Sequence, residues 1–257
     1  MLKLYGVPLS QPFRSVAWAL LLKQCPFKAV VTVPFLADKP FGSKHESYKS
    51  RTKARSDRIP MLQDGTFYLV ESPAILCYLC ESRGWMDLYG PPGSQRKALI
   101  DSYMHWHHSG TRGIASLVAP YLIPGGSHGP RDKELHRAHQ LLKQLESGWL
   151  HPDENYIVGN EISIADLLCY EELAQSSMTG LIDLADYPAI QSWMQRMEQQ
   201  PFFEEVHLGL KTLGLLSESN DRPLNQRLQA ATKAGLAGLE KAQAGFVSGG
   251  SQSASKL

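Results

Sequence analysis

Residues 59–74 read IPMLQDGTFYLVESPA and predict a β-hairpin that leads directly into a helix. Asp64-Gly65 lies between two apolar runs, which is among the strongest short-range signals for a tight hairpin turn. Ser72 follows at a helix N-cap position, with Pro73 in the first turn. We therefore expect two antiparallel strands and then a helix that ends near residue 82.

The residues before this hairpin alternate between strand and helix patterns. Leu2–Gly6 and Phe27–Val33 are predicted strands, and Phe13–Lys23 carries apolar residues at helical spacing. Residues 34–58 show no clear period, so we expect irregular structure with a short helix. The order β-α-β-α-β-β-α over residues 1–82 predicts a thioredoxin-like domain, with one mixed four-stranded sheet and helices on both faces.

The pattern changes to all-helical after a breaker cluster, Gly90-Pro91-Pro92-Gly93, which is typical of an interdomain linker. The fold class is therefore α/β plus all-α, with a helical domain over residues 94–216 and a tail over residues 217–257. Predicted helices cover about 94–118, 131–149, 164–178, 188–199 and 201–211, with a possible short strand near Tyr156. In the tail we expect one helix over 223–244 and disorder in the last dozen residues.

Composition excludes several function classes. The 257 residues carry a net charge of +1, whereas nucleic acids and acidic membranes favour a clear basic excess. No apolar run reaches the roughly 20 residues of a membrane-spanning helix, and no signal-peptide layout is seen at the N-terminus. Four cysteines do not make a disulfide framework. We expect a cytoplasmic protein.

Ser10 lies between the first predicted strand and the first helix, and two interpretations are open. Its hydroxyl could cap the helix by accepting a backbone N–H bond, which local evidence favours. Alternatively, the hydroxyl could face a ligand at the helix N-terminus, where the partial positive charge attracts anions.

Two further features flank the predicted hairpin. Pro60 stands directly before a strand, where it cannot donate to the ladder, so Ile59-Pro60 is either an ordinary trans edge proline, which base rates favour, or a cis bond. Glu71-Ser72 offers a carboxylate and a hydroxyl beside a helix N-terminus, a combination that could bind an amine and a carboxylate.

These pieces, in this order and spacing, resemble the glutathione site of cytosolic glutathione transferases, and Ser10-Gln11-Pro12 with the nearby arginine resembles the theta class best. The resemblance covers about residues 2–210. It implies that the Ser10 hydroxyl donates a hydrogen bond to the glutathione sulfur as the catalytic group. It also implies a set of glutathione-binding residues: Gln11, His45, Arg58, Ile59, Pro60, Glu71 and Ser72.

Each part of that set has an implied task. The backbone of Ile59, before a cis-proline, pairs with the cysteinyl part of glutathione, and the Glu71-Ser72 pair holds the γ-glutamyl end. His45 stands fifteen residues before the proline, where theta-like proteins place a histidine on the glycyl end. Glu46 and Asp57 add negative charge to this region, so glutathione and a related thiol both stay open.

The helical domain fits the same resemblance. Trp106 and Arg112 match a theta-class tryptophan and arginine that form the wall of the second-substrate site. Ser163 and Asp166 form a predicted capping box, whose role is in folding. The resemblance implies a homodimeric detoxification enzyme that joins glutathione to small hydrophobic electrophiles, with possible peroxidase or dehalogenase activity. Glutathione is then a co-substrate, and neither a cofactor nor a metal is expected.

Three alternatives compete with this interpretation. Cys77 and Cys80 have redox-motif spacing, but they do not follow the first strand, so we expect buried apolar groups. Among the histidines at 105, 107 and 108, residues 107 and 108 point to different helix faces and no cysteine or carboxylate has fitting spacing, which disfavours a metal site. The strongest rival is a non-catalytic module of the same fold that serves in a translation or stress complex.

Overall fold

The structure is a computed structural model of the 257-residue chain that describes residues 1–53, 55–122, 132–216 and 223–248. Contacts divide these residues into two compact units. The first contains residues 1–53, 55–72, 201–212 and 223–248, and the second contains residues 73–122, 132–200 and 213–216. The predicted disorder of the last dozen residues falls mostly on 249–257, which lie outside the described residues.

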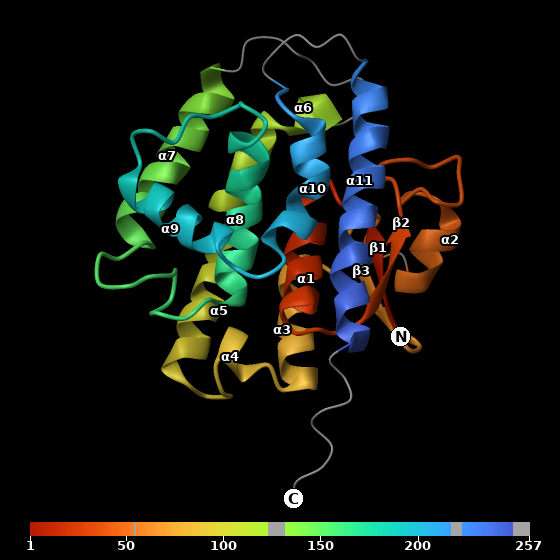
Figure 1. Cartoon of the computed structure of the whole chain (residues 1–257), viewed down its shortest axis with the longest axis horizontal. Helices are drawn as coiled ribbons and strands as arrows, with labels where there is room; N and C mark the ends of the chain where they lie inside the picture. The colour runs from red at the N-terminus through yellow and green to blue at the C-terminus, as the bar shows by residue number, and fades with distance from the viewer. Residues whose placement is uncertain (54, 123–131, 217–222, 249–257) are drawn as a thin grey trace, which may run out of the picture. The chain divides into compact units, whose positions relative to one another are not determined.

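A four-stranded sheet forms the centre of the first unit, as predicted (Figure 1). Its strands are β1 (Leu2–Gly6), β2 (Phe27–Val31), β3 (Met61–Asp64) and β4 (Phe67–Val70), in the order β2-β1-β3-β4. β1 pairs with β2 in parallel, while β3 is antiparallel to both β1 and β4. Gly65 has φ +58° in the β3–β4 turn, a conformation that glycine adopts without steric cost.

The strand register brings separate parts of the sequence to one edge of this sheet. Tyr5 is paired with Met61, and Met61 is paired in turn with Val70. The residues after Tyr5, those before Met61 and those after Val70 therefore leave the sheet at the same end. Because β2 runs parallel to β1, the segment that follows Val31 leaves there as well.

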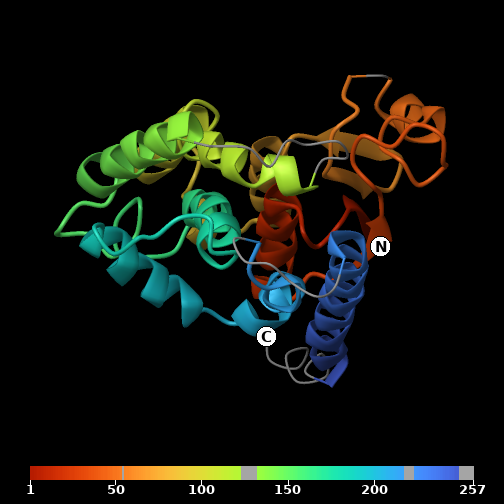
Figure 2. The same ribbon diagram turned by 90° about the horizontal axis from the view of Figure 1, so that it is seen from above.

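The helices of the first unit come from both ends of the chain. They are α1 (Gln11–Leu22), the short α2 (Glu46–Lys49), α10 (Phe203–Leu213) and α11 (Leu224–Ala244), with the 3₁₀ turns η1 (Ser50–Thr52) and η3 (Gly245–Ser248). The last residue of α10 falls in the second unit. α1 and α10 lie side by side in Figures 1 and 2, with α11 alongside. The buried indole of Trp18 joins α1 to the start of α10, since its Nε1 donates to the Pro201 carbonyl at 2.9 Å.

The second unit is helical, as predicted. Its elements are α3 (Ser72–Arg83), which begins at the last residue of the first unit, α4 (Met86–Tyr89), α5 (Gln95–His107), the 3₁₀ segment η2 (Thr111–Leu117), α6 (Ala119–Leu122), α7 (Asp132–Gly148), α8 (Ile164–Ser177) and α9 (Pro188–Glu198). None of the described helices is both long and apolar enough to cross a membrane.

Two local expectations in this unit are wrong. The predicted helix over 94–118 is interrupted at Gly110, whose backbone is non-helical and whose missing β-carbon leaves room for the Trp106 ring. The stretch around Tyr156 forms bends in place of a strand.

The predicted capping pair at the start of α8 is confirmed. The Asp166 carboxylate accepts from the backbone N–H and the hydroxyl of Ser163 at 2.9 and 2.7 Å. It also accepts from the Ile157 N–H and the Trp193 indole, both at 2.9 Å. Complete burial raises the pKa of Asp166, and these donors lower it in part. The carboxylate thus ties together three segments of the helical unit.

Candidate active site

Ser10 occupies the N-cap position of α1, and its backbone satisfies the helix end. Its carbonyl accepts from the N–H groups of Phe13 and Arg14 at 3.1 and 3.0 Å, and its own N–H donates to the Val7 carbonyl at 2.9 Å. The side chain makes no capping hydrogen bond. The interpretation of the Ser10 hydroxyl as a helix cap is therefore wrong.

The local sequence explains why the Ser10 hydroxyl makes no capping hydrogen bond. A capping side chain accepts from the N–H of the second or third helical residue. The second helical residue is Pro12, which has no N–H. The third is Phe13, whose N–H already donates to the Ser10 carbonyl. The half-buried Ser10 hydroxyl thus lies at a helix N-terminus but does not cap the helix. Gln11, the first residue of α1, is buried.

Ile59 and Pro60 lie at the same end of the sheet, directly before β3. The bond between them is cis. Across the described residues, neither the N–H nor the C=O of Ile59 has a backbone hydrogen-bond partner. Both groups can therefore pair with an extended ligand, as the resemblance implied for this position.

Tyr48 holds this segment in place, and the sequence analysis missed it. Its side chain is 1% exposed, and its hydroxyl donates to the Arg58 carbonyl at 2.6 Å. The ring packs with Tyr5 and Met61, and the Ile59 side chain lies against this cluster. Burial raises the pKa of the Tyr48 hydroxyl, which therefore stays protonated as a donor. A lone aromatic residue in the polar segment 44–58 was the signal that could have revealed it.

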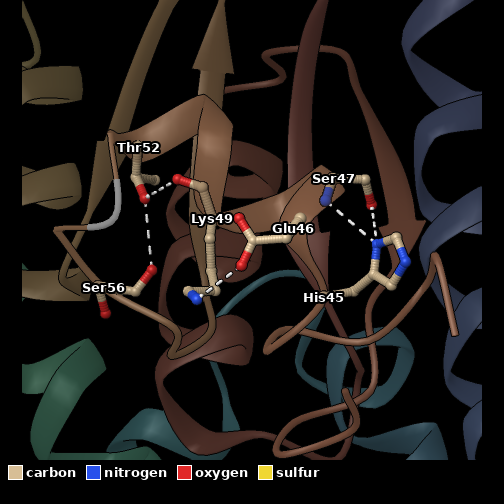
Figure 3. Close-up of polar contacts among 6 residues, drawn as sticks. All are labelled: His45, Glu46, Ser47, Lys49, Thr52 and Ser56. Carbon is tan, nitrogen blue, oxygen red and sulfur yellow. Dashed lines mark hydrogen bonds and ion pairs between the residues drawn. The ribbon is translucent and has the colours of Figure 1, made fainter. Parts of the chain in front are cut away.

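His45 starts the short helix α2, as Figure 3 shows. Its Nδ1 accepts from the Ser47 N–H at 3.1 Å. Nδ1 also lies 2.9 Å from the Ser47 hydroxyl, and in the tautomer in which Nδ1 is the acceptor the proton of a neutral ring lies on Nε2. The half-buried imidazole can therefore cap α2 and still offer one N–H donor to a ligand.

The acidic residues near His45 carry less free charge than the sequence indicated. The Glu46 carboxylate pairs with the Lys49 ammonium at 2.9 Å (Figure 3). This hydrogen bond from Lys49 lowers the pKa of Glu46. Arg58 is exposed and adds positive charge to the same segment, while Asp57 is half-buried there. The negative charge of Glu46, next to His45 in the chain, is thus balanced in part by Lys49.

Glu71 and Ser72 connect β4 to α3. Glu71 is exposed and has φ +72°, a left-handed conformation that a non-glycine residue rarely adopts. Such outliers concentrate at ligand sites, where the surrounding structure enforces them. Ser72 is buried at the first position of α3. A carboxylate and a hydroxyl thus lie together at the sheet edge that also carries Ser10 and Ile59.

Trp106 belongs to the second unit, where it packs in an aromatic cluster. Its ring centroid lies 5.2 Å from that of Trp149 and 5.7 Å from that of Tyr103. A β-carbon at Gly110 would lie 2.5 Å from the indole. Within this unit the half-buried Trp106 therefore packs at the end of α5.

Arg112 pairs with a buried carboxylate of α8. Its Nη1 donates to Glu172 Oε1 at 2.7 Å, and the two side chains are 38% and 1% exposed. His107 Nε2 lies 3.8 Å from the same oxygen. Burial, helped by the charges of Arg112 and His108, lowers the pKa of His107 to about 3. His107 is thus neutral at pH 7, and part of the Arg112 charge is balanced by Glu172.

The cysteine and histidine alternatives gain no support. Cys77 and Cys80 lie on α3, and both are thiols that form no disulfide with each other. Burial raises the pKa of Cys77, which is the opposite of what a reactive thiolate needs. Among the described residues, no group of three His, Cys, Asp or Glu side chains is arranged to hold a metal ion.

Comparison with known proteins agrees with this geometry. The family model of the glutathione S-transferase N-terminal domain matches residues 4–92, and that of the glutathione S-transferase C-terminal domain matches residues 115–201. The chain belongs to the glutathione S-transferase family, whose members are enzymes. The thioredoxin-like sheet followed by helices, predicted from the sequence, is confirmed.

Within this family, the chain is similar to members of the theta class. The chain is 30% identical to glutathione S-transferase theta-1 of Gallus gallus over 82% of its own length and 91% of that protein's. It is 32% identical to theta-2 of Mus musculus over 77% and 80% of the two lengths. The apo structure of human glutathione-S-transferase T1-1 superimposes with a TM-score of 0.72 and 26% identity, over 92% of this chain and 100% of that one.

Proposed function

We propose that this enzyme transfers the thiolate of glutathione to small hydrophobic electrophiles, and that the Ser10 hydroxyl stabilises the thiolate. One observation carries the proposal. The Ser10 hydroxyl is released from helix capping by Pro12, and it stands at the sheet edge that also carries the unpaired backbone of Ile59 and the strained Glu71.

The energetics of this arrangement are sufficient. A free thiol has a pKa of about 8.5, and lowering it by about two units requires roughly 2.7 kcal/mol. One hydrogen bond to an ion supplies about 1.5–3 kcal/mol, and a helix N-terminus adds about 0.3–1 kcal/mol. Ser10 and the start of α1 therefore suffice without a metal or a general base.

The other residues would bind the tripeptide. The N–H and C=O groups of Ile59 pair with the cysteinyl backbone, in the manner of an added strand. Glu71 and Ser72 hold the amine and carboxylate of the γ-glutamyl end, and His45 and Arg58 hold the glycyl carboxylate. This division of charges fits glutathione, although a related thiol with the same termini would satisfy it as well.

The reaction is then a nucleophilic displacement or addition. The sulfur forms a bond to the electrophilic carbon after the thiol proton has passed to solvent. In a displacement the leaving group departs with the electron pair of the broken bond. In an addition the π electron pair moves to the neighbouring atom, which takes a proton from solvent. Trp106 and Arg112 are proposed to line the electrophile site. Because Glu172 balances part of the Arg112 charge, we assign most of the thiolate stabilisation to Ser10. Peroxidase or dehalogenase activity, a homodimer and a cytosolic location belong to the same proposal.

The test compares Ser10, the N-cap residue of α1, with Ser15 inside the helix. Ser10→Ala should raise the pKa of the bound thiol by about one to two units, lower turnover at neutral pH in proportion to the thiolate lost, and leave the Tm unchanged. Ser15→Ala is the matched control, because the Ser15 hydroxyl donates to the Pro12 carbonyl at 3.0 Å inside the helix. Titration of thiolate absorbance and turnover of an alkyl halide give the two readouts.

The same experiment separates the enzyme from its rival. A wild-type protein that neither stays on immobilised glutathione nor turns over any of several electrophiles would be a non-catalytic module. A protein that binds glutathione, with identical thiol titrations for the wild type and Ser10→Ala, would keep the family activity and remove Ser10 from its assigned role.

A further inference from the structure

α11 approaches the rest of the first unit through small residues. Its buried positions include Ala231, Gly235 and Gly238. At Gly209 of α10, an added β-carbon would lie 2.8 Å from the Ala231 carbonyl oxygen and 3.2 Å from the Gly235 Cα. The two helices therefore cross in backbone-to-backbone contact at Gly209 and Gly235.

The other side of Gly235 faces the loop that carries Ser10. A β-carbon built on Gly235 would lie 3.1 Å from Pro8 Cγ and even closer to Pro8 Cβ. The proline ring is rigid and cannot rotate away from such a contact. Gly235 is thus packed between α10 and Pro8, and a β-carbon at this position would overlap the Pro8 ring.

Pro8 is also fixed from within α1. Its carbonyl accepts from Arg14 Nη1 at 3.2 Å, and the Arg14 side chain is buried. The turn that contains Pro8 is closed by the hydrogen bond from the Ser10 N–H to the Val7 carbonyl at 2.9 Å. A movement of Pro8 must therefore move the backbone of Ser10, only two residues further along.

We propose that Gly235 is a positioning residue for the Ser10 hydroxyl, so that α11 acts as a support for the thiolate-stabilising loop. This inference rests on the function proposed above and assigns a role to the tail after residue 216. A side chain at position 235 displaces Pro8 and with it the Ser10 backbone, which lengthens the hydrogen bond from Ser10 to the thiolate.

Two glycines on the same helix provide a matched pair for the test. A β-carbon at Gly238 would also be too close to the backbone, but the three heavy atoms nearest to it all belong to Glu205 of α10 and not to Pro8. Gly235→Ala and Gly238→Ala should therefore both lower the Tm. Only Gly235→Ala should raise the pKa of bound glutathione, by about one unit, with a matching loss of kcat at neutral pH.

A double variant keeps the test informative if Gly235→Ala folds poorly. Pro8→Gly removes the ring that the methyl group introduced by Gly235→Ala would meet. Pro8→Gly combined with Gly235→Ala should therefore show the same thiol pKa as Pro8→Gly alone. Each variant is prepared as the full chain, and bound glutathione is titrated by its thiolate absorbance.

The outcomes are distinct. A wild-type protein that does not lower the thiol pKa at all contradicts the proposed function. A wild-type protein that lowers it, with Gly235→Ala unchanged or with Gly238→Ala raised by the same amount, contradicts the role of Gly235 and leaves the proposed function intact.

Discussion

At the scale of single residues, the chemistry depends on which polar groups the backbone leaves unused. Ser10 has the residue type and position of an ordinary helix cap. Its hydroxyl nevertheless finds no backbone donor, because Pro12 has no N–H and the Phe13 N–H already donates to the Ser10 carbonyl. His45 does cap its helix, and the ring keeps a second nitrogen for other contacts. Residue type alone does not separate these two cases, whereas the hydrogen-bond partners of the neighbouring residues do.

His107 provides a pH prediction at this scale. Because burial lowers its pKa from 6.5 to about 3, the unfolded chain binds a proton at this position between those values and the folded chain does not. The free energy of unfolding therefore decreases as the pH falls below 6.5, by up to about 1.4 kcal/mol per pH unit from this group.

His107→Gln should remove this contribution. Urea unfolding of both proteins at pH 7, 5 and 4 measures it, and the wild type should lose more stability over this range than the variant. Other groups, such as Asp166, contribute equally to the pH dependence of both proteins. Only the difference between the two slopes of unfolding free energy against pH is therefore used. Parallel curves would contradict a neutral buried His107.

At the scale of elements, the segment between β2 and β3 shows how irregular structure can be rigid. The Thr52 hydroxyl donates to the Lys49 and Ser56 carbonyls at 3.1 and 3.3 Å (Figure 3). The Arg51 guanidinium lies over the Tyr5 ring, 5.3 Å from its centroid. Together with the Tyr48 hydrogen bond, these contacts attach the segment to the sheet, although its sequence has no period.

The two tasks assigned to His45 can be separated by two variants. His45→Ala removes both the cap of α2 and the Nε2 donor, while His45→Asn restores a cap, since asparagine is a good N-cap residue. If the ring binds the glycyl carboxylate, both variants should raise the KM for glutathione about tenfold, the loss of one hydrogen bond to a charged group.

Neither variant should change the thiol pKa, because His45 acts on the other end of the ligand. Steady-state kinetics with varied glutathione gives the KM. Recovery of the wild-type KM in His45→Asn would show that capping is the whole role of His45.

At the scale of the whole molecule, the first unit is assembled from both ends of the chain. α11 buries Leu239 against it, and Gln243 Oε1 accepts from the Phe27 N–H of β2 at 2.9 Å. Burial of one leucine contributes about 1.5–3 kcal/mol, so α11 is a substantial part of the stability of this unit. Helix α11 therefore belongs structurally with the thioredoxin-like sheet.

Two truncations test this assembly. A chain that ends at residue 222 lacks α11, and it should show a lower Tm and a higher pKa of bound glutathione. A chain that ends at Ser248 keeps α11 and should match the full-length protein in both. Differential scanning calorimetry and thiolate titration give the two values, and an unchanged thiol pKa in the shorter chain would contradict the supporting role of α11.

The sequence determined what depends on near neighbours. The Asp64-Gly65 turn, the pair of Ser163 and Asp166, the strand and helix order of residues 1–82 and the helix over 223–244 are all local patterns, and the structure shows each of them. The spacing of Ser10, His45, Pro60 and Glu71 indicated the family, which the comparisons confirm.

Only the tertiary structure decided what depends on distant partners. The contact of Gly235 with Pro8 and the ion pair of Arg112 with Glu172 join positions far apart in the chain. The Tyr48 hydrogen bond and the left-handed Glu71 backbone arise because the packed sheet edge forces them. A local pattern carries no signal of these contacts, because their free energy is gained only when the whole unit folds and brings the partners together.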